Sequence, residues 1–273
     1  MRTMSRITFH MEPMQAMKIL APLQINTKIN DTLQVAKIYM DSPKYGLLTQ
    51  QLKALDVDYN EYTEIVYSKK ELETSELFYV IPNRYCGYPQ PDSNGGYLEQ
   101  SYDLASGCSR CANGFVQNRP LRILKPQMGN TDIVSLYWVY EFIITIKLKN
   151  VIEDEGLTGC EFWPVIDHNK NVVINGIYQL HITNIMPPMS EKTSFLKAPM
   201  VKECECGKKG YYIDEGKIYD QNSVDLIKDF NKTFEWLGAG ESTWQLPLFS
   251  KQAYKVFNKH NIKGLRFEPI MIM

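Results

Sequence analysis

The chain has 273 residues, of which 44% are hydrophobic and 22% are charged, and this composition excludes an intrinsically disordered protein. Thirty Lys and Arg residues are balanced by 31 Asp and Glu residues, so the formal net charge is -1. A dedicated nucleic-acid binder normally carries a basic excess, and the charge balance disfavours that class. The length predicts one large domain or two modest ones.

The N-terminal region lacks the uninterrupted apolar segment of a secretory signal. The longest apolar stretch, Ile133 to Ile146, contains Ser135 and Glu141 and is too short for a membrane span. We therefore expect a soluble, cytoplasmic protein without a membrane partner. Residues 1–30 include several methionines that could each start the chain, and we expect them to form a loosely held arm.

The next part of the chain predicts short helices and strands. Leucines between residues 47 and 55 are spaced for one face of a helix. Ser68 and Glu71 have the spacing of a capping box, which starts a brief helix. Strand-like runs follow, and we expect strands at residues 62–67, 77–81, 119–124, 133–140 and 177–182. The segment 82–96 is rich in Pro, Gly, Asn and Asp and predicts a loop.

The best candidate for a linker is the segment Met186-Pro187-Pro188, because adjacent prolines neither continue a helix nor fit a central strand. The boundary placed there divides the remainder into an α+β domain over residues 31–190 and a C-terminal subdomain over residues 191–273.

Two segments of the chain resemble each other. Thr145 to Val165 and Ser250 to Ile270 carry apolar residues at the same offsets, followed by Gly, Phe and Pro at matching positions (Gly159, Phe162 and Pro164; Gly264, Phe267 and Pro269). Each pattern predicts an amphipathic helix, a turn at the glycine and a strand that ends at the proline. The similarity indicates either a repeated helix–turn–strand unit or chance likeness between two ordinary units. Both interpretations predict an α+β fold with mixed or antiparallel sheets backed by short helices.

The two segments differ in charge where their helices end. The first has Glu153, Asp154 and Glu155, whereas the second has Asn, Lys and His at residues 258–260. A helix C-terminus favours cations, so the acidic residues are unfavourably placed. They are interpreted either as an ordinary solvated surface or as an acidic patch that binds a basic partner.

Two cysteine pairs form a candidate metal site. Cys108 and Cys111 have the spacing of a zinc knuckle, and Cys204 and Cys206 form a Cys-x-Cys pair that is one residue shorter. Four thiolates from two turns can hold one structural zinc ion in tetrahedral geometry. Ordinary reduced cysteines and a redox pair are the alternatives, although Gly114 disfavours the helix that follows a thioredoxin-like motif.

The remaining two cysteines have separate roles in this interpretation. Cys86 lies in the predicted loop and is a possible replacement ligand, whereas Cys160 lies on the strand of the first repeat-like segment and is expected in the core.

Together, the Gly-Cys-x-x-Cys at residues 107–111, the Cys-x-Cys-Gly at 204–207 and the closing Gly-x-x-Phe-x-Pro at 264–269 resemble the double-CXXCG motif family, from about Tyr97 to the C-terminus. The short second pair departs from the family spacing. Members of that family are bacterial proteins predicted to act as immunity proteins. The resemblance implies a non-enzymatic protein that binds and neutralises a cognate protein toxin and uses its cysteines for structure.

Other chemistries have weaker sequence support. The four histidines, His10, His168, His181 and His260, do not form a zinc-protease motif, and the chain has no P-loop. The aromatic run at residues 137–142 predicts a buried strand. A zinc-ribbon nucleic-acid binder is the alternative function. An enzyme would require a cleft that combines His181 with an acid such as Glu161 or Asp229.

Overall fold

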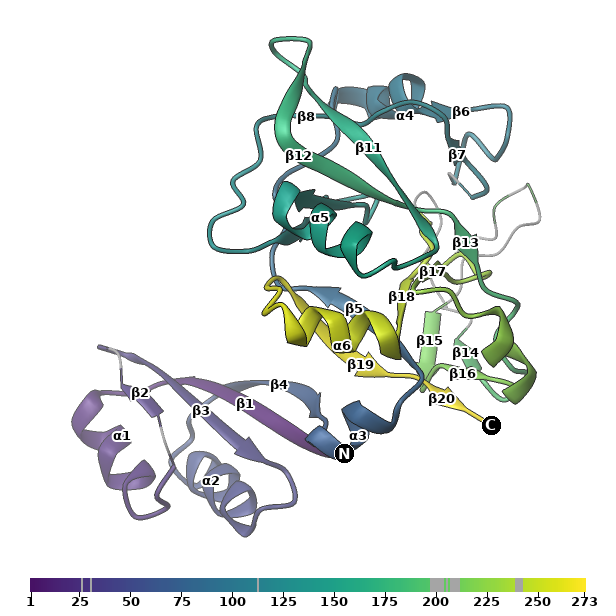
Figure 1. Ribbon diagram of the computed structural model, residues 1–273. Helices are drawn as coiled ribbons and strands as arrows, with labels where there is room; N and C mark the ends of the chain where they lie inside the picture. Colours follow the sequence, from purple (N-terminus) through teal and green to yellow (C-terminus); the bar gives the residue numbers. More distant parts are fainter. Residues whose placement is uncertain are drawn as a thin grey trace. The chain divides into compact units, whose positions relative to one another are not determined.

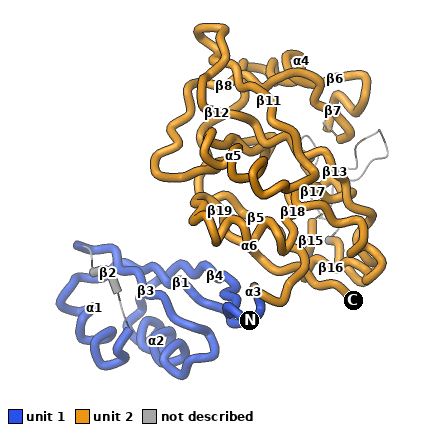
Figure 2. Tube along the Cα trace, in the orientation of Figure 1, with its two compact units in different colours: residues 1–72 blue, residues 73–273 orange. Residues whose placement is uncertain are grey.

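The computed structural model describes residues 1–25, 27–29, 31–111, 113–196, 204, 206, 212–238 and 243–273. It divides into two compact units, Met1–Leu72 and Glu73–Met273 (Figure 2). This division differs from the boundaries expected at residues 30 and 190. The proline-containing segment is no linker, because Met186 and Met189 are buried in a core of the second unit.

The first unit is a four-stranded antiparallel sheet with strand order β2-β3-β1-β4. Two helices pack on one face of it, because buried side chains of α1 and α2 join those of β1 and β3 in one cluster. This βαββαβ order is a split βαβ arrangement. The elements are β1 (Arg2–His10), α1 (Pro13–Leu20), β2 (Thr27–Ile29), β3 (Leu33–Tyr39), α2 (Pro43–Ala54) and β4 (Tyr59–Val66).

Residues 2–10, 13–20 and 27–29 form β1, α1 and β2 of this unit, in contrast to the loose arm expected for residues 1–30. Strand β1 pairs with β3 on one side and β4 on the other, so it is a central strand. Ile7 and Phe9 alternate with more exposed residues and are almost completely buried. The alternation that buries one face of a strand is present in the sequence, but it extends over only a few residues.

Local signals in the first unit are confirmed. The predicted leucine segment forms helix α2, in which Leu48 and Leu52 are fully buried while Leu47 is exposed. Leu55 follows the last residue of the helix and is exposed as well. Helix α3 (Lys69–Thr74) begins at the predicted capping box. The Ser68 backbone N–H donates to Glu71 Oε2 at 2.7 Å, and the Glu71 backbone N–H donates to Ser68 Oγ at 3.3 Å. Helix α3 ends at Thr74, two residues after the last residue of the first unit, Leu72.

The second unit contains two five-stranded sheets, with strand orders β8-β11-β12-β10-β9 and β13-β17-β18-β5-β19 (Figure 1). Both are mixed, since β8 runs parallel to β11 and β13 parallel to β17. The predicted mixture of sheets and short helices is therefore confirmed. The sheet strands are β5 (Leu77–Pro82), β8 (Arg122–Ile123), β9 (Ile133–Ser135), β10 (Phe142–Thr145), β11 (Cys160–Asp167), β12 (Val172–Ile182), β13 (Asn184–Ile185), β17 (Phe230–Lys232), β18 (Pro247–Ser250) and β19 (Leu265–Pro269).

Shorter helices and strands surround these sheets, joined by loops. Three two-stranded pairs, β6 with β7, β14 with β15 and β16 with β20, connect neighbouring loops. The elements are η1 (Ser93–Gly95), α4 (Gly96–Ser101), β6 (Tyr102–Asp103), β7 (Val116–Gln117), α5 (Ile146–Asp154), β14 (Ser194–Leu196), β15 (Tyr212–Glu215), β16 (Ile218–Tyr219), η2 (Gln221–Leu226), α6 (Lys251–Lys259) and β20 (Met271–Ile272). No helix in the described part of the chain combines the length and apolarity that a membrane crossing requires.

Helices α5 and α6 share one hydrophobic core with strands of both five-stranded sheets. Leu148 and Ile152 from α5 meet Ala253 and Phe257 from α6, together with buried residues of β5, β9, β10, β12, β17 and β18. Strand β10 is buried on both faces, because Ile143 belongs to a different cluster from its neighbours Phe142 and Ile144. The two sheets and two helices thus form a single framework on which the loops are mounted.

Both segments that resemble each other fold as helix, glycine turn and strand, as predicted. The strand of the second segment ends at Pro269 as expected, whereas β11 continues past Pro164 to Asp167 with a register shift between Pro164 and Ile166. Thr145 caps α5 and Ser250 caps α6, each accepting a hydrogen bond from the backbone N–H three residues on. Gly159 and Gly264 have φ angles of +91° and +132°, which favour glycine. A Cβ atom at Gly264 would lie 2.1 Å from the Ile133 carbonyl oxygen, so a side chain has no room there.

Candidate metal centre and adjoining cavity

The structure brings the four predicted metal ligands together. Cys108 and Cys111 lie in the turn between β6 and β7, and Cys204 and Cys206 lie between β14 and β15. The four sulfur atoms are all within 4.8 Å of one another. The Sγ–Sγ distance is 3.5 Å between Cys108 and Cys204 and 3.7 Å between Cys111 and Cys206. Segments almost a hundred residues apart therefore converge on one site.

This arrangement fits a tetrahedral metal ion. With metal–sulfur bonds of about 2.3 Å, tetrahedral geometry places the sulfur atoms about 3.8 Å apart. The two closest pairs, at 3.5 and 3.7 Å, are near that separation. Four thiolates select zinc or iron over the hard cations magnesium and calcium. A centre closed by four protein ligands is typical of a structural site, because no coordination position remains for a substrate.

The first cysteine turn stabilises a thiolate. The backbone N–H groups of Cys111 and Arg110 donate to the Cys108 sulfur and lower its pKa to about 6. Burial has the opposite effect on Cys111 and raises its pKa to about 12. Gly107, which precedes the turn, allows a close approach of the chain, because a Cβ atom there would lie 2.5 Å from the Phe115 backbone nitrogen. A bound cation would favour the ionised form of all four cysteines.

The other two cysteines lie outside the centre. Cys86 packs beside the cluster that contains Leu121 and Val165, and Cys160 packs beside the core shared by α5 and α6. Cys86 is thus not a ligand in this arrangement, and Cys160 contacts the core as predicted from its strand position.

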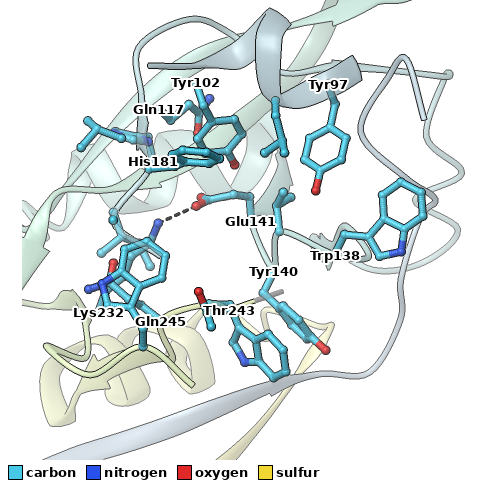
Figure 3. A pocket seen from close by; sticks show the side chains of 18 of the residues that line it. Tyr97, Tyr102, Gln117, Trp138, Tyr140, Glu141, His181, Lys232, Thr243 and Gln245 are labelled. Atoms are coloured by element: carbon cyan, nitrogen blue, oxygen red, sulfur yellow. Dashed lines mark hydrogen bonds and ion pairs between the residues drawn. The ribbon is translucent and has the colours of Figure 1, made fainter. Parts of the chain in front are cut away.

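A cavity of about 1040 Å³ adjoins the cysteine centre (Figure 3). Ser109 and Arg110, the two residues between the first cysteines, line it directly. On another wall, Thr243 Oγ1 donates a 2.9 Å hydrogen bond to the Cys111 carbonyl oxygen. The centre therefore fixes the position of cavity-lining residues from distant segments. The walls are rich in aromatic rings, which include Tyr97, Tyr102, Trp138, Tyr140, Trp236 and Trp244.

A buried ion pair occupies one end of the cavity. Lys232 Nζ lies 2.5 Å from Glu141 Oε1, and both side chains are largely buried. Gln179 Nε2 donates to the second oxygen of Glu141 at 3.2 Å, and Gln179 and Gln117 also pair through their amide groups. Figure 3 shows Lys232 and Glu141 pointing toward each other. Each charge is compensated, which is the condition under which buried charges are tolerated.

His181 lines the same end, but neither acid considered for an enzyme joins it in the cavity lining. Its ring stacks on Trp163 with centroids 4.2 Å apart, and burial lowers its pKa, which favours the neutral imidazole. Glu161 is its partner on the neighbouring strand and does not line the cavity, while Asp229 binds the backbone N–H of Thr158. Within the described residues, the Nδ1 atom of His181 is buried and has no hydrogen-bond partner.

The aromatic run at residues 137–142 differs from the buried strand expected there. Only Phe142 belongs to a strand, as the first residue of β10, whereas Tyr137 and Trp138 are each 42% exposed. Trp138 and Tyr140 adopt left-handed backbone conformations with φ angles of 67° and 54°. Such conformations are uncommon for bulky residues and concentrate at binding and active sites. They turn the chain out of the sheet and place both rings on the cavity wall.

The predicted acidic patch at residues 153–155 lies at the end of α5, and two of its members have partners within the chain. Glu153 forms an ion pair with Lys149 at 2.5 Å. Glu155 binds Lys259 at 2.7 Å and His260 at 2.6 Å, and these hydrogen bonds lower its pKa. The acidic end of one helix thus meets the basic end of the other. A role of the patch in partner binding stays a prediction.

Comparison with protein-family models gives no match for the chain, and a search of curated proteins gives no significant match. The resemblance to the double-CXXCG family therefore rests on the cysteine and glycine motifs themselves.

Proposed function

We propose that this protein is a binding protein of the immunity type that neutralises a cognate protein toxin by direct contact, with a structural zinc ion in the four-cysteine centre. The observation that carries the proposal is the position of that centre at the wall of a large aromatic cavity. Cys108, Cys111, Cys204 and Cys206 would hold the ion, which would supply cross-linking of two loops and no reactive coordination position.

The groups around the cavity support binding more than catalysis. The acid and the base at its polar end, Glu141 and Lys232, are bonded to each other. His181 has a lowered pKa and stacks on a tryptophan, and neither of the two acids considered as its partners lines the cavity. General acid–base catalysis requires an acid or base within reach of the substrate and free to exchange a proton, and pairing of Glu141 with Lys232 opposes that role.

The nature of the walls supports a protein as the partner. Tyrosine, tryptophan and arginine are the residues most enriched at the centres of protein interfaces, and the cavity contains all three types. The resemblance to the double-CXXCG family adds the class of partner, a protein toxin. No residue of the first unit lines the cavity, and that unit has no assigned role in the proposal.

The proposal is tested by co-expression with the product of the adjacent gene. We expect the protein to protect cells from that product and to co-purify with it, and we expect one zinc ion per chain by elemental analysis. Cys86→Ala is the matched control for Cys108→Ser, because Cys86 is also a free cysteine of the second unit but lies outside the centre. Absence of both complex and protection would contradict the immunity function, and absence of bound metal would contradict the zinc assignment.

We also propose that the scaffold is an internal repeat, because two aspartates outside the segments, Asp132 and Asp229, bind them in the same reciprocal way. Asp132 Oδ2 accepts from the Lys263 backbone N–H at 2.9 Å, in the turn of the second segment. Asp229 Oδ2 accepts from the Thr158 backbone N–H at 2.8 Å, in the turn of the first. The carbonyl oxygen of each aspartate also accepts from the residue that caps the following helix, at 3.0 Å in both cases. Matching contacts of this kind are expected from two copies of one unit.

A further inference from the structure

We infer that the cavity and the row of aromatic rings outside it form one groove, which receives an extended segment of the protein partner and holds an aromatic side chain of that segment. The inference rests on the proposed function, to which it adds the binding surface and the chemistry of the occupant. We call this surface the aromatic groove; it consists of the cavity and the rings of Tyr85, Tyr88 and Tyr137.

The row of rings is continuous with the cavity. Tyr85 stacks on Tyr137 with centroids 4.6 Å apart, and Tyr137 stacks on Tyr88 at 4.9 Å. Tyr88 contacts Trp138 at 4.4 Å, and Trp138 reaches Tyr97 at 5.7 Å. Trp138 and Tyr97 line the cavity, so the same row of rings runs from the surface into it. Tyr88, Tyr137 and Trp138 are each 40–42% exposed, which is a large exposed aromatic area in one place.

A second aromatic pair in the cavity lining, Tyr140 and Trp244, is also held in place. Tyr140 and Trp244 stack with centroids 4.7 Å apart. Trp244 follows Thr243, which is hydrogen-bonded to the Cys111 carbonyl oxygen in the cysteine centre. Figure 3 shows Trp138 and Tyr97 together at one side of the cavity and Lys232 at the other. A side chain that enters between these walls meets flat apolar surfaces first and the polar end last.

The continuity of the aromatic wall favours a protein segment over a small molecule. Pockets for small ligands usually enclose most of their ligand, whereas these rings continue from the cavity onto the surface, so an occupant that contacts all of them extends beyond the cavity. A single-stranded nucleic acid would require a groove with several cations beside the rings, whereas the lining within the described residues has two, Arg110 and Lys232, and Lys232 is neutralised by Glu141. Aromatic anchors in a desolvated pocket are typical of protein hot spots.

The probe for the first experiment is a library of random linear peptides displayed on phage and selected on the zinc-loaded full-length protein. We expect enrichment of peptides that contain aromatic residues. Trp138→Ala should weaken their binding at least tenfold, and Trp138→Phe should restore most of it because the ring is retained. Tyr62→Ala is the control, since Tyr62 is an exposed aromatic residue of the first unit and should leave binding unchanged. Circular dichroism of each variant verifies that it is folded.

A second experiment separates this inference from the proposed function by measuring the affinity of the same variants for the product of the adjacent gene. If that product binds wild type and Trp138→Ala equally, the groove inference fails while the immunity function stands. If peptides bind through Trp138 but the product does not bind at all, the immunity function fails and the groove inference stands. Selection of no peptide, or Trp138-dependent binding of an oligosaccharide or a DNA oligonucleotide instead, would overturn the inference.

Discussion

Removal of the second cysteine pair should destabilise the second unit selectively. The perturbation is the double substitution Cys204→Ser with Cys206→Ser, which deletes two of the four candidate ligands. The metal would connect Cys108 to Cys204 across a separation of 96 residues. A cross-link that closes a loop of this length restricts the unfolded chain and stabilises the fold by about 5 kcal/mol in the chain-entropy model. We expect the double variant to lose roughly that amount.

Urea unfolding followed by tryptophan fluorescence measures this loss, because all four tryptophans, at positions 138, 163, 236 and 244, belong to the second unit. The transition of zinc-loaded wild type should move to a much lower urea concentration in the double variant. Cys86→Ala supplies the control, and zinc should raise the stability of this variant as it does for wild type. Equal midpoints for wild type and the double variant, or equal stabilisation of both by zinc, would refute the reasoning.

Three further substitutions test the framework and the cavity by urea or thermal unfolding. Lys232→Met should lower the free energy of unfolding by about 3–5 kcal/mol, because it leaves the buried carboxylate of Glu141 without its cation. Adding Glu141→Gln should recover much of that loss, and an unchanged stability of the single variant would contradict the buried pair. Gly264→Ala should destabilise the protein by about 3 kcal/mol or more, since the new Cβ atom would meet a backbone carbonyl group. Gly46→Ala is the control, because the space around Gly46 is open, and equal effects of the two substitutions would contradict the steric argument. Burial raises the pKa of Glu235, so the folded protein binds a proton at this carboxyl more readily than the unfolded chain does. The stabilisation that this provides is therefore present below the ordinary glutamate pKa and is lost as the pH rises through the pKa of the folded state. Glu235→Gln should therefore stabilise the protein more at pH 8 than at pH 4, and a pH-independent difference would count against the shift.

Features that depend on neighbouring residues could be predicted from the sequence. Helices α5 and α6 have apolar residues on one face, a Thr or Ser cap and a following glycine, all within about twenty residues, and they form where expected. The capping box at Ser68 depends on four residues only, and both of its hydrogen bonds form. The convergence of the two cysteine pairs was also predicted, because a Cys-x-x-Cys turn and a second close pair match the ligand pattern of a four-thiolate site.

Features that depend on remote contacts could not be predicted in this way. The cavity combines side chains from loops and strands between Asn94 and Pro247, and the pairing of those strands has no signal within any single segment. The left-handed conformation of Trp138 is one example, since nothing in a run of aromatic residues distinguishes an exposed turn from a buried strand. The central position of β1 was likewise hidden, because its partners β3 and β4 lie tens of residues away.

The position of β5 has a consequence for how the protein is made. Strand β5 (Leu77–Pro82) pairs with β18 on one side and β19 on the other. These two neighbours are formed by residues 247–250 and 265–269, near the end of the chain. During synthesis, β5 therefore leaves the ribosome long before either neighbour exists, and at about 5–20 residues per second the delay is about 10–40 s. The first unit has all its strands within 72 residues and can close its sheet at once. The apolar strand β5 needs protection from aggregation until the last part of the chain arrives, so we expect dependence on chaperones to concentrate in the second unit.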